Sequence, residues 1–272
     1  MRRKELHNNG IKTIVERYNS FNEFANTCNN RPLVWEGDVA GGARKRRNET
    51  SFTRCETFEE AQEFLLKGFN ESVPKMIAKV NGLSSGTRVK TKRYSDVVGF
   101  APIVPNALLG LPNSMMNSKK TRVKSKVITI VYDPSVNGGV PAGDVLDYGC
   151  RFINFVQNLE RQGVRVRVDY AKHTQDTSNR RQYILRVPLK SENQPLNIKR
   201  MSFAMTHVGM QRFLAFDWIE RVPDSQYIWG YGTSLPSVSE EYKDCARKAL
   251  DDNEYLVYFG MDLDTLFEGG GR

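Results

Sequence analysis

The stretch "KVITIVYDPSVNGGVPAGDVLDYGCRFINFVQNLERQGVRVRVDYA", residues 126–171, carries most of the information about the fold. Its first eight residues form a nearly continuous apolar and β-branched run, which is typical of a strand buried on both faces. Residues 142–163 then repeat apolar side chains at helical spacing and end in glycine, which predicts an amphipathic helix. Residues 164–171 alternate valine with charged residues, as a half-buried strand does. Strand, helix and strand in this order predict a βαβ unit with parallel strands and a right-handed crossover.

The rest of the second half extends this unit. "HTQDTSNRR" is rich in turn residues and "QYILRVPLK" has the pattern of a strand, so residues 164–189 should form a hairpin. Helical patterns follow between residues 195 and 250, and "EYLVYFG" predicts a late strand. The expected fold class is α/β, with a three-layer open sheet of the Rossmann-like type over residues 121–272.

The first half, residues 1–120, is expected to be a basic and mainly helical region. Ser20 with Glu23 and Thr57 with Glu60 have the spacing of a capping box at the start of a helix. The apolar stretch "DVVGFAPIVPNALLGLPNSMMN", residues 96–117, is interrupted by prolines and is expected to wrap over a core formed by other elements. The two parts could be separate domains divided near residue 120 or one compact unit.

Charge is distributed unevenly along the chain. Residues 1–126 hold 23 Lys and Arg against 12 Asp and Glu, whereas residues 127–272 hold 17 against 19. Clusters of this kind suit a polyanion, because each cation placed on a phosphate releases a condensed counterion. The alternative is a solvated basic face or basic loops that only confer solubility. The candidate nucleic-acid-binding residues are Arg44, Lys45, Arg46, Arg47, Arg88, Lys90, Lys92, Arg93, Lys119, Lys120, Arg122, Lys124 and Lys126.

Composition limits the class of protein. No window of about 18 uninterrupted apolar residues exists, and the N-terminus has no apolar stretch of signal-peptide length. We therefore expect a soluble protein with no membrane partner. The four cysteines never occur as C-x-x-C and there are only three histidines, which favours free buried thiols over a zinc site or a disulfide framework.

The loop from Asp133 to Gly143 follows the first strand at the carboxyl edge of the expected sheet, where open α/β sheets bind ligands. Its order Asp133, Pro134, Ser135, Val136, Asn137 resembles the D-x-S-x-S metal motif of von Willebrand factor A-type domains, and the resemblance covers residues 124–190. It implies that Asp133, Ser135 and Asn137 hold a magnesium ion. Asparagine stands where the family has its second serine, and the family's later threonine and aspartate have no assigned counterparts. The alternative is that Asp133 caps a turn.

Other catalytic patterns are weak. The loop matches neither a dinucleotide fingerprint nor a P-loop, and no HExxH or GxSxG occurs, so no catalytic residue is assigned. His207 with Asp217 or Glu220 would make an acid–base or nuclease-like pair, but the apolar spacing around them favours a core helix. Three aromatic residues have faces that could stack on bases: Trp35, Trp229 and Tyr231. The favoured interpretation of "WGYG" is a tight turn with aromatic packing.

A wider resemblance concerns the whole chain. The order "SFTRCETFEEAQEFLLKGF", "DVVGFAPIVPNALLGLPNSMM", "VITIVYD", "LERQGVRVRV", "HVGMQRFLAFDWIE" and "GYG" resembles functionally uncharacterised proteins of tailed bacteriophages, from about residue 20 to 232. This resemblance implies a phage-encoded protein in a bacterial cytoplasm and supplies no activity.

Three functions stay open. The favoured hypothesis is a non-enzymatic accessory protein that binds nucleic acid through its basic first half, since the charge asymmetry is a stronger signal than a partial metal motif. The first alternative is a von Willebrand A-like module that binds a protein partner through a metal at Asp133. The second alternative is a magnesium-dependent nuclease.

Overall fold

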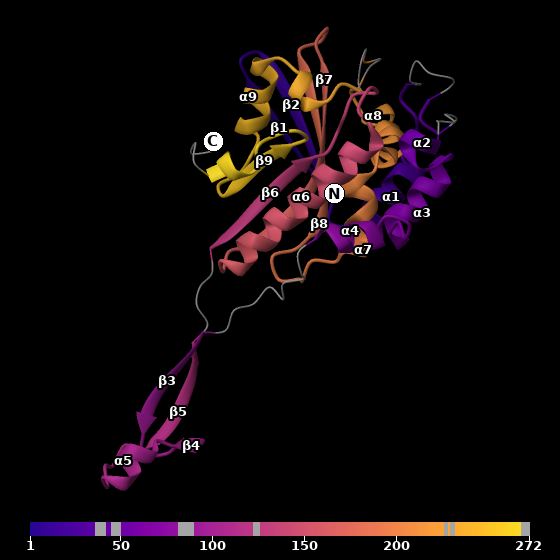
Figure 1. The fold of residues 1–272 in the computed structure, drawn as a ribbon. Coiled ribbons are helices and arrows are strands. Elements are labelled where there is room, and N and C mark those ends of the chain that lie inside the picture. The colour runs from indigo at the N-terminus through magenta and orange to yellow at the C-terminus, as the bar shows by residue number, and fades with distance from the viewer. Residues whose placement is uncertain are drawn as a thin grey trace.

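In the computed structural model the chain is described at residues 1–35, 42–44, 50–80, 90–121, 126–225, 228 and 232–267. Figure 1 shows a body built around one sheet and an arm that projects from it. The sheet has six strands in the order β1-β2-β8-β7-β6-β9. The strands are β1 (Arg2–Asn8), β2 (Ile11–Arg17), β6 (Val127–Asp133), β7 (Arg165–Asp176), β8 (Arg181–Lys190) and β9 (Glu254–Tyr258).

The sheet is mixed, and it confirms the α/β class. Strand β6 pairs in parallel with both β7 and β9, and β7 pairs antiparallel with β8. The predicted βαβ unit therefore forms around helix α6 (Ala142–Arg161), and the predicted hairpin forms from β7 and β8. The parallel pairing of β2 with β8 was not predicted from the sequence.

Helices cover both faces of the sheet because the strands alternate their apolar side chains. On β6, Ile130 packs into the large core cluster under α6 and α7 (Ile198–Thr206), whereas its neighbour Val131 packs into a second cluster under α9 (Glu240–Lys248). The remaining helices of the body are α1 (Phe21–Asn30), α2 (Thr50–Thr53), α3 (Phe58–Lys67), α4 (Val73–Lys79), a π-helix (Met210–Ala215) followed by α8 (Phe216–Glu220), and the 3-10 turns Leu235–Ser237 and Asp264–Phe267.

Both predicted capping boxes form. The Ser20 hydroxyl accepts the Glu23 N–H at 3.1 Å, and the Thr57 hydroxyl accepts the Glu60 N–H at 3.2 Å. Each glutamate carboxylate in turn accepts an N–H just upstream, which satisfies a further donor at the start of α1 and α3.

The first half is not only helical, since it supplies two strands to the main sheet and the strands of the arm. Asn9 and Gly10 join β1 to β2 with φ of 52° and 72°, the left-handed values that a tight hairpin turn requires. Strand β2 and helices α1, α3 and α4 contribute to the same sheet and the same large core as the second half. The described residues up to Val80 thus share one core with the second half.

A buried charge network ties the sheet together. Arg186 on β8 is 4% exposed, and its guanidinium donates to both carboxylate oxygens of Glu254 on β9 at 2.7 Å. It also donates to Asp169 on β7 at 2.9 Å, and Arg17 on β2 lies 3.3 Å from the same aspartate. Four strands therefore contribute to one set of paired charges.

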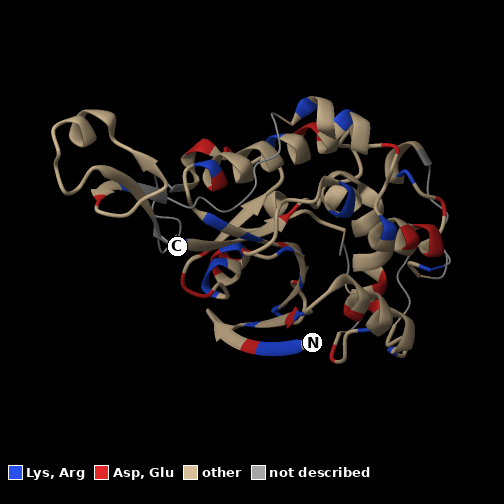
Figure 2. Ribbon diagram, turned by 90° about the horizontal axis from the view of Figure 1, so that it is seen from below, with Lys and Arg blue, Asp and Glu red and all other residues tan. Residues whose placement is uncertain are grey.

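The arm, residues 90–121, corrects one expectation. It consists of β3 (Lys90–Asp96), β4 (Ala101–Pro102), α5 (Val104–Leu108) and β5 (Met115–Thr121), with the strand order β3-β5-β4. The apolar stretch was expected to wrap over a core, and this was wrong: Val98, Leu108 and Leu109 expose 74%, 83% and 74% of their surface. The stretch instead closes a separate small sheet that Figures 1 and 2 show apart from the body.

Helices α6 and α7 approach so closely that Gly149 has no room for a side chain. A Cβ there would lie 2.8 Å from the carbonyl oxygen of Met205 and 2.7 Å from Cγ2 of Thr206. The backbone of one helix would have to move to accept even a methyl group.

Gly149→Ala should therefore lower the free energy of unfolding by about 1–3 kcal/mol, the usual range for overpacking. Urea denaturation measures the change. Gly143→Ala is the matched control in the same helix, because a Cβ at Gly143 meets nothing within 4 Å. The control should be neutral or stabilising by up to about 1 kcal/mol. Equal effects of the two substitutions would contradict the close-approach argument.

Candidate functional site

Two basic clusters that are far apart in sequence meet on the arm. In the ladder between β3 and β5, Lys92 is paired with Lys119, Thr91 with Lys120 and Arg93 with Ser118. We call the paired segments 90–93 and 118–121 the stem. Lysines thus occupy opposed positions of the ladder, an arrangement that is unfavourable unless an anion balances it.

The stem and the residues that flank it in sequence account for the net charge of the protein. Residues 88–93 and 119–126 together hold nine Lys and Arg and no Asp or Glu, which equals the whole chain's excess of +9. The remainder of the chain is balanced, with 31 Lys and Arg against 31 Asp and Glu. The excess of positive charge therefore belongs to the stem and its flanks in the sequence and is not spread over the whole chain.

The candidate nucleic-acid-binding residues of this region fall into three groups. Arg93 and Lys126 have exposed side chains. Lys90, Lys92, Lys119 and Lys120 are placed by the backbone ladder. Arg88, Arg122 and Lys124 lie outside the described residues.

The third basic cluster does not join them. The guanidinium of Arg44 donates to Asp217 at 2.8 Å and to the carbonyl of Cys28, and it lies 4.4 Å from the centre of the Phe58 ring. Arg44 therefore stabilises the body through intramolecular contacts. Lys45, Arg46 and Arg47 lie outside the described residues.

The loop after β6 is held by Asp133, which is 1% exposed. Its Oδ1 accepts the N–H of Ser135 at 2.9 Å, the turn-capping contact weighed as the alternative. Its Oδ2 accepts the N–H of His173 at 3.1 Å and lies 2.7 Å from Nδ1 of the same residue. Burial alone would raise the pKa of Asp133, but the His173 hydrogen bond and the charges of His173 and Lys172 outweigh it and hold the pKa below its usual value.

Lys172 supplies a cation beside this carboxylate. The residue is fully buried, and its Nζ donates to the carbonyl of Thr233 at 2.9 Å. Burial lowers the pKa of Lys172 to about 8, with Asp133 opposing the shift and Arg212 adding to it. Lys172 and His173 were not singled out from the sequence, although two consecutive polar residues directly after the alternating run of β7 are the signal that could have identified them.

The donors near Asp133 do not fit a magnesium ion as they stand. Both Asp133 oxygens have hydrogen-bond partners, and the Asn137 amide accepts from Ser234 and donates to Ser237. Of the three candidate ligands, only Ser135 has a side-chain oxygen without a hydrogen-bond partner among the described residues. A cation would have to displace His173 from Oδ2 and tolerate the charge of Lys172. Within the same residues no group of three or more His, Cys, Asp or Glu is close enough to hold a metal.

The suggested acid–base pair does not form. His207 bonds to the Thr206 hydroxyl at 2.7 Å, whereas Asp217 pairs with Arg44 and Arg221. Glu220 accepts the N–H of Ala43 with both oxygens, at 3.1 and 3.0 Å. Each of these groups is engaged in a different contact of the body.

The aromatic candidates are placed only in part. Trp35 packs against the large core and its indole N–H donates to Ser225 at 2.9 Å, so it stabilises the body. Trp229 and Tyr231 lie outside the described residues.

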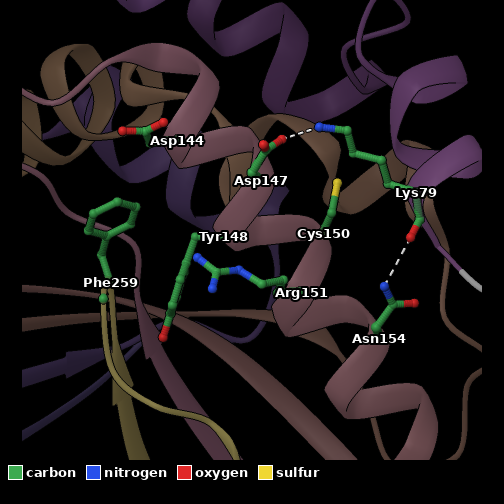
Figure 3. A pocket seen from close by; sticks show the side chains of 9 residues that line it. Lys79, Asp144, Asp147, Tyr148, Cys150, Arg151, Asn154 and Phe259 are labelled. Atoms are coloured by element: carbon green, nitrogen blue, oxygen red, sulfur yellow. Dashed lines mark hydrogen bonds and ion pairs between the residues drawn. The ribbon is translucent and has the colours of Figure 1, made fainter.

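A surface pocket lies beside α6 (Figure 3). Lys79 forms an ion pair with Asp147, and its carbonyl accepts from Asn154 at 3.0 Å. The Tyr148 hydroxyl donates to the carbonyl of Tyr258 at 2.8 Å, and Arg151 lies over the Tyr148 ring. These contacts join α4, α6 and the end of β9, so we interpret the pocket as structural.

The burial of Lys172 predicts how the stability of the protein changes with pH. The pKa of Lys172 in the folded protein lies below the ordinary value of 10.5, so the unfolded chain binds more protons between pH 8 and 10.5. Stability should therefore rise with pH across this window, by at most about 3 kcal/mol from this residue.

Lys172→Met should remove that rise. Urea denaturation of both proteins below pH 8 and above pH 10 measures the free energy of unfolding of each. In the wild-type value minus the variant value, the contributions of the other titrating groups cancel. Exposed Lys75→Met is the control and should leave the difference constant. A constant difference for Lys172→Met as well would contradict the prediction.

A family model described as a domain of unknown function (DUF7192) matches residues 3–264 and so covers the body and the arm. Neither the curated proteins nor the solved structures gave a match. Within the described part of the chain, no helix combines the length and the apolar composition needed to cross a membrane.

Proposed function

The chain belongs to the DUF7192 family, whose function is unknown, and from that premise we propose that it is a non-enzymatic nucleic-acid-binding protein that uses the stem of its arm. The observation that carries the proposal is the convergence of two basic clusters on one β-ribbon. The stem segments and their flanks account for the entire net charge, while the rest of the chain is neutral.

The shape of the stem suits a duplex. A two-stranded β-ribbon is narrow enough to enter the major groove of B-DNA, which is about 12 Å wide. Cations on both strands of the ribbon can then face phosphates on either side of the groove. Such contacts supply affinity and orientation without reading sequence, so the proposal is for a binding mode with little sequence preference.

Replacing Lys119, Lys120 and Arg122 by alanine should weaken binding to labelled DNA and RNA at low salt. Each lost phosphate contact reduces the slope of log K against log salt by about 0.9 on duplex DNA, so the variant slope should fall by about two to three. Fluorescence anisotropy across a salt series measures both affinity and slope, and a denaturing gel checks that the probe stays intact.

A matched control separates the stem from total charge. Lys75→Ala, Arg161→Ala and Lys199→Ala remove three exposed cations from the body. This triple variant should keep the wild-type slope. Equal weakening by both variants, or undiminished binding by the stem variant, would overturn the proposal.

A second proposal concerns the second half of the body, which we infer to be a von Willebrand A-like module. Its support is the local strand order β8-β7-β6-β9 with an antiparallel β8, and the position of Asp133 at the carboxyl end of β6. The phage origin and the magnesium site stay predictions, and the donor set described above does not favour the metal.

Thermal unfolding with and without magnesium tests the metal. If an ion binds at Asp133, magnesium should raise the melting temperature of the wild type and leave that of Asp133→Asn unchanged. An identical melting temperature of the wild type with and without magnesium would exclude a magnesium site at Asp133. It would also exclude the alternative of a magnesium-dependent nuclease that uses this site.

A further inference from the structure

The outer end of the arm has a surface unlike that of the body. Residues 97–118 form a run of 22 residues without a charged side chain, and Figure 2 shows the end of the arm without the colours of charged residues. We call residues 97–116 the tip. Exposed large apolar side chains gather on the tip and just below it: Tyr94, Val97, Val98, Phe100, Val104, Leu108, Leu109 and Leu111. Exposed apolar patches of this kind mark interaction surfaces.

We propose that the tip is a self-association surface, on which the tip of a second copy of this chain docks. The main reason is area. Each of the eight side chains exposes between 41% and 83% of its surface. Together they offer an apolar area of the order of the ~800 Å² that each partner buries in a standard interface. One tip is therefore large enough to hold a partner of its own kind.

The contact should be made by side chains and not by strand addition. Strand β3 is an edge of the arm's sheet, and it carries Lys90, Lys92 and Arg93 along that edge. Charged residues on an edge strand discourage pairing with another strand. Helix α5 and the turn after it, which hold Leu108 and Leu109, have no such charges and form the most exposed part of the surface.

The structure favours a second copy over a lipid bilayer. The tip exposes the polar side chain of Asn113 beside its apolar residues. An amide group is costly in hydrocarbon, where no water can reach it. At an interface between two proteins the polar rim and bridging water can satisfy such groups.

Docking of two tips places two arms with positive stems in one complex, and their mutual repulsion gives the inference a distinctive signature. Salt screens the repulsion between the stems, so self-association should strengthen as salt rises. Binding of the stem to nucleic acid should weaken as salt rises. A nucleic acid that neutralises the stems should promote association at low salt, and this last expectation alone rests on the proposed function.

Sedimentation velocity of the full chain without nucleic acid tests the inference. The wild type should associate reversibly as its concentration rises, and more tightly at higher salt. The double variant Leu108→Asp, Leu109→Asp should weaken association by at least about a hundredfold, because two large apolar side chains leave the interface. Ile77→Asp, which places one aspartate on an exposed apolar residue of the body, is the control and should associate as the wild type does.

The stem variant keeps the two proposals distinguishable. Replacing Lys119, Lys120 and Arg122 by alanine should strengthen association at low salt while it weakens nucleic-acid binding. If the wild type associates but binds no nucleic acid, only the proposed function is contradicted. A wild type that stays monomeric at every concentration and salt, or a tip variant that associates normally, overturns the self-association surface. Monomeric wild type that binds phosphatidylglycerol vesicles through the tip also overturns it and assigns the tip to a membrane surface.

Discussion

The arrangement of the body depends on the buried guanidinium of Arg186. A buried charge is tolerated only when its partners lie at hydrogen-bonding distance, and breaking such a pair costs about 3–5 kcal/mol. Arg186 finds Asp169 on the neighbouring strand and Glu254 three strands away, at the start of β9. The distances hold only in the observed register of β7, β8 and β9, so the network specifies the register as well as stabilising it. Arg17 brings β2 into the same set of charges.

Local signals in the sequence predicted local structure well. The two capping boxes, the βαβ unit and the β7–β8 hairpin each arise from residues close together in the chain, and all of them formed. The β1–β2 hairpin was missed although Asn9-Gly10, a strong signal for a tight turn, stands between two suitable runs. The pairing of β2 with β8 joins residues about 170 positions apart, and no local pattern encodes such a partner.

The candidate site shows the same division. The basic clusters were visible in the sequence, but their meeting on one ribbon depends on the antiparallel pairing of β3 with β5. The apolar run between them was assigned to a core, because composition alone does not distinguish a buried surface from an interaction surface. Arg44 looked like its basic neighbours, yet Asp217, 173 residues away in sequence, holds it in the body. Lys172 and His173 gained significance only when the fold placed them beside Asp133.

The position of β2 in the sheet has a consequence for synthesis on the ribosome. Strand β8 emerges about 170 residues after β2, a delay of about 10–30 s at usual elongation rates. During that time the first hairpin has an unpaired edge, and Ile14 and Val15 lack the neighbours that later bury them. The apolar arm also emerges before β8 does. A nascent chain in this state exposes both an unpaired strand edge and an apolar surface, which are prone to aggregation. The yield of folded protein in a cell should therefore depend on chaperones that bind the chain before β8 pairs with β2.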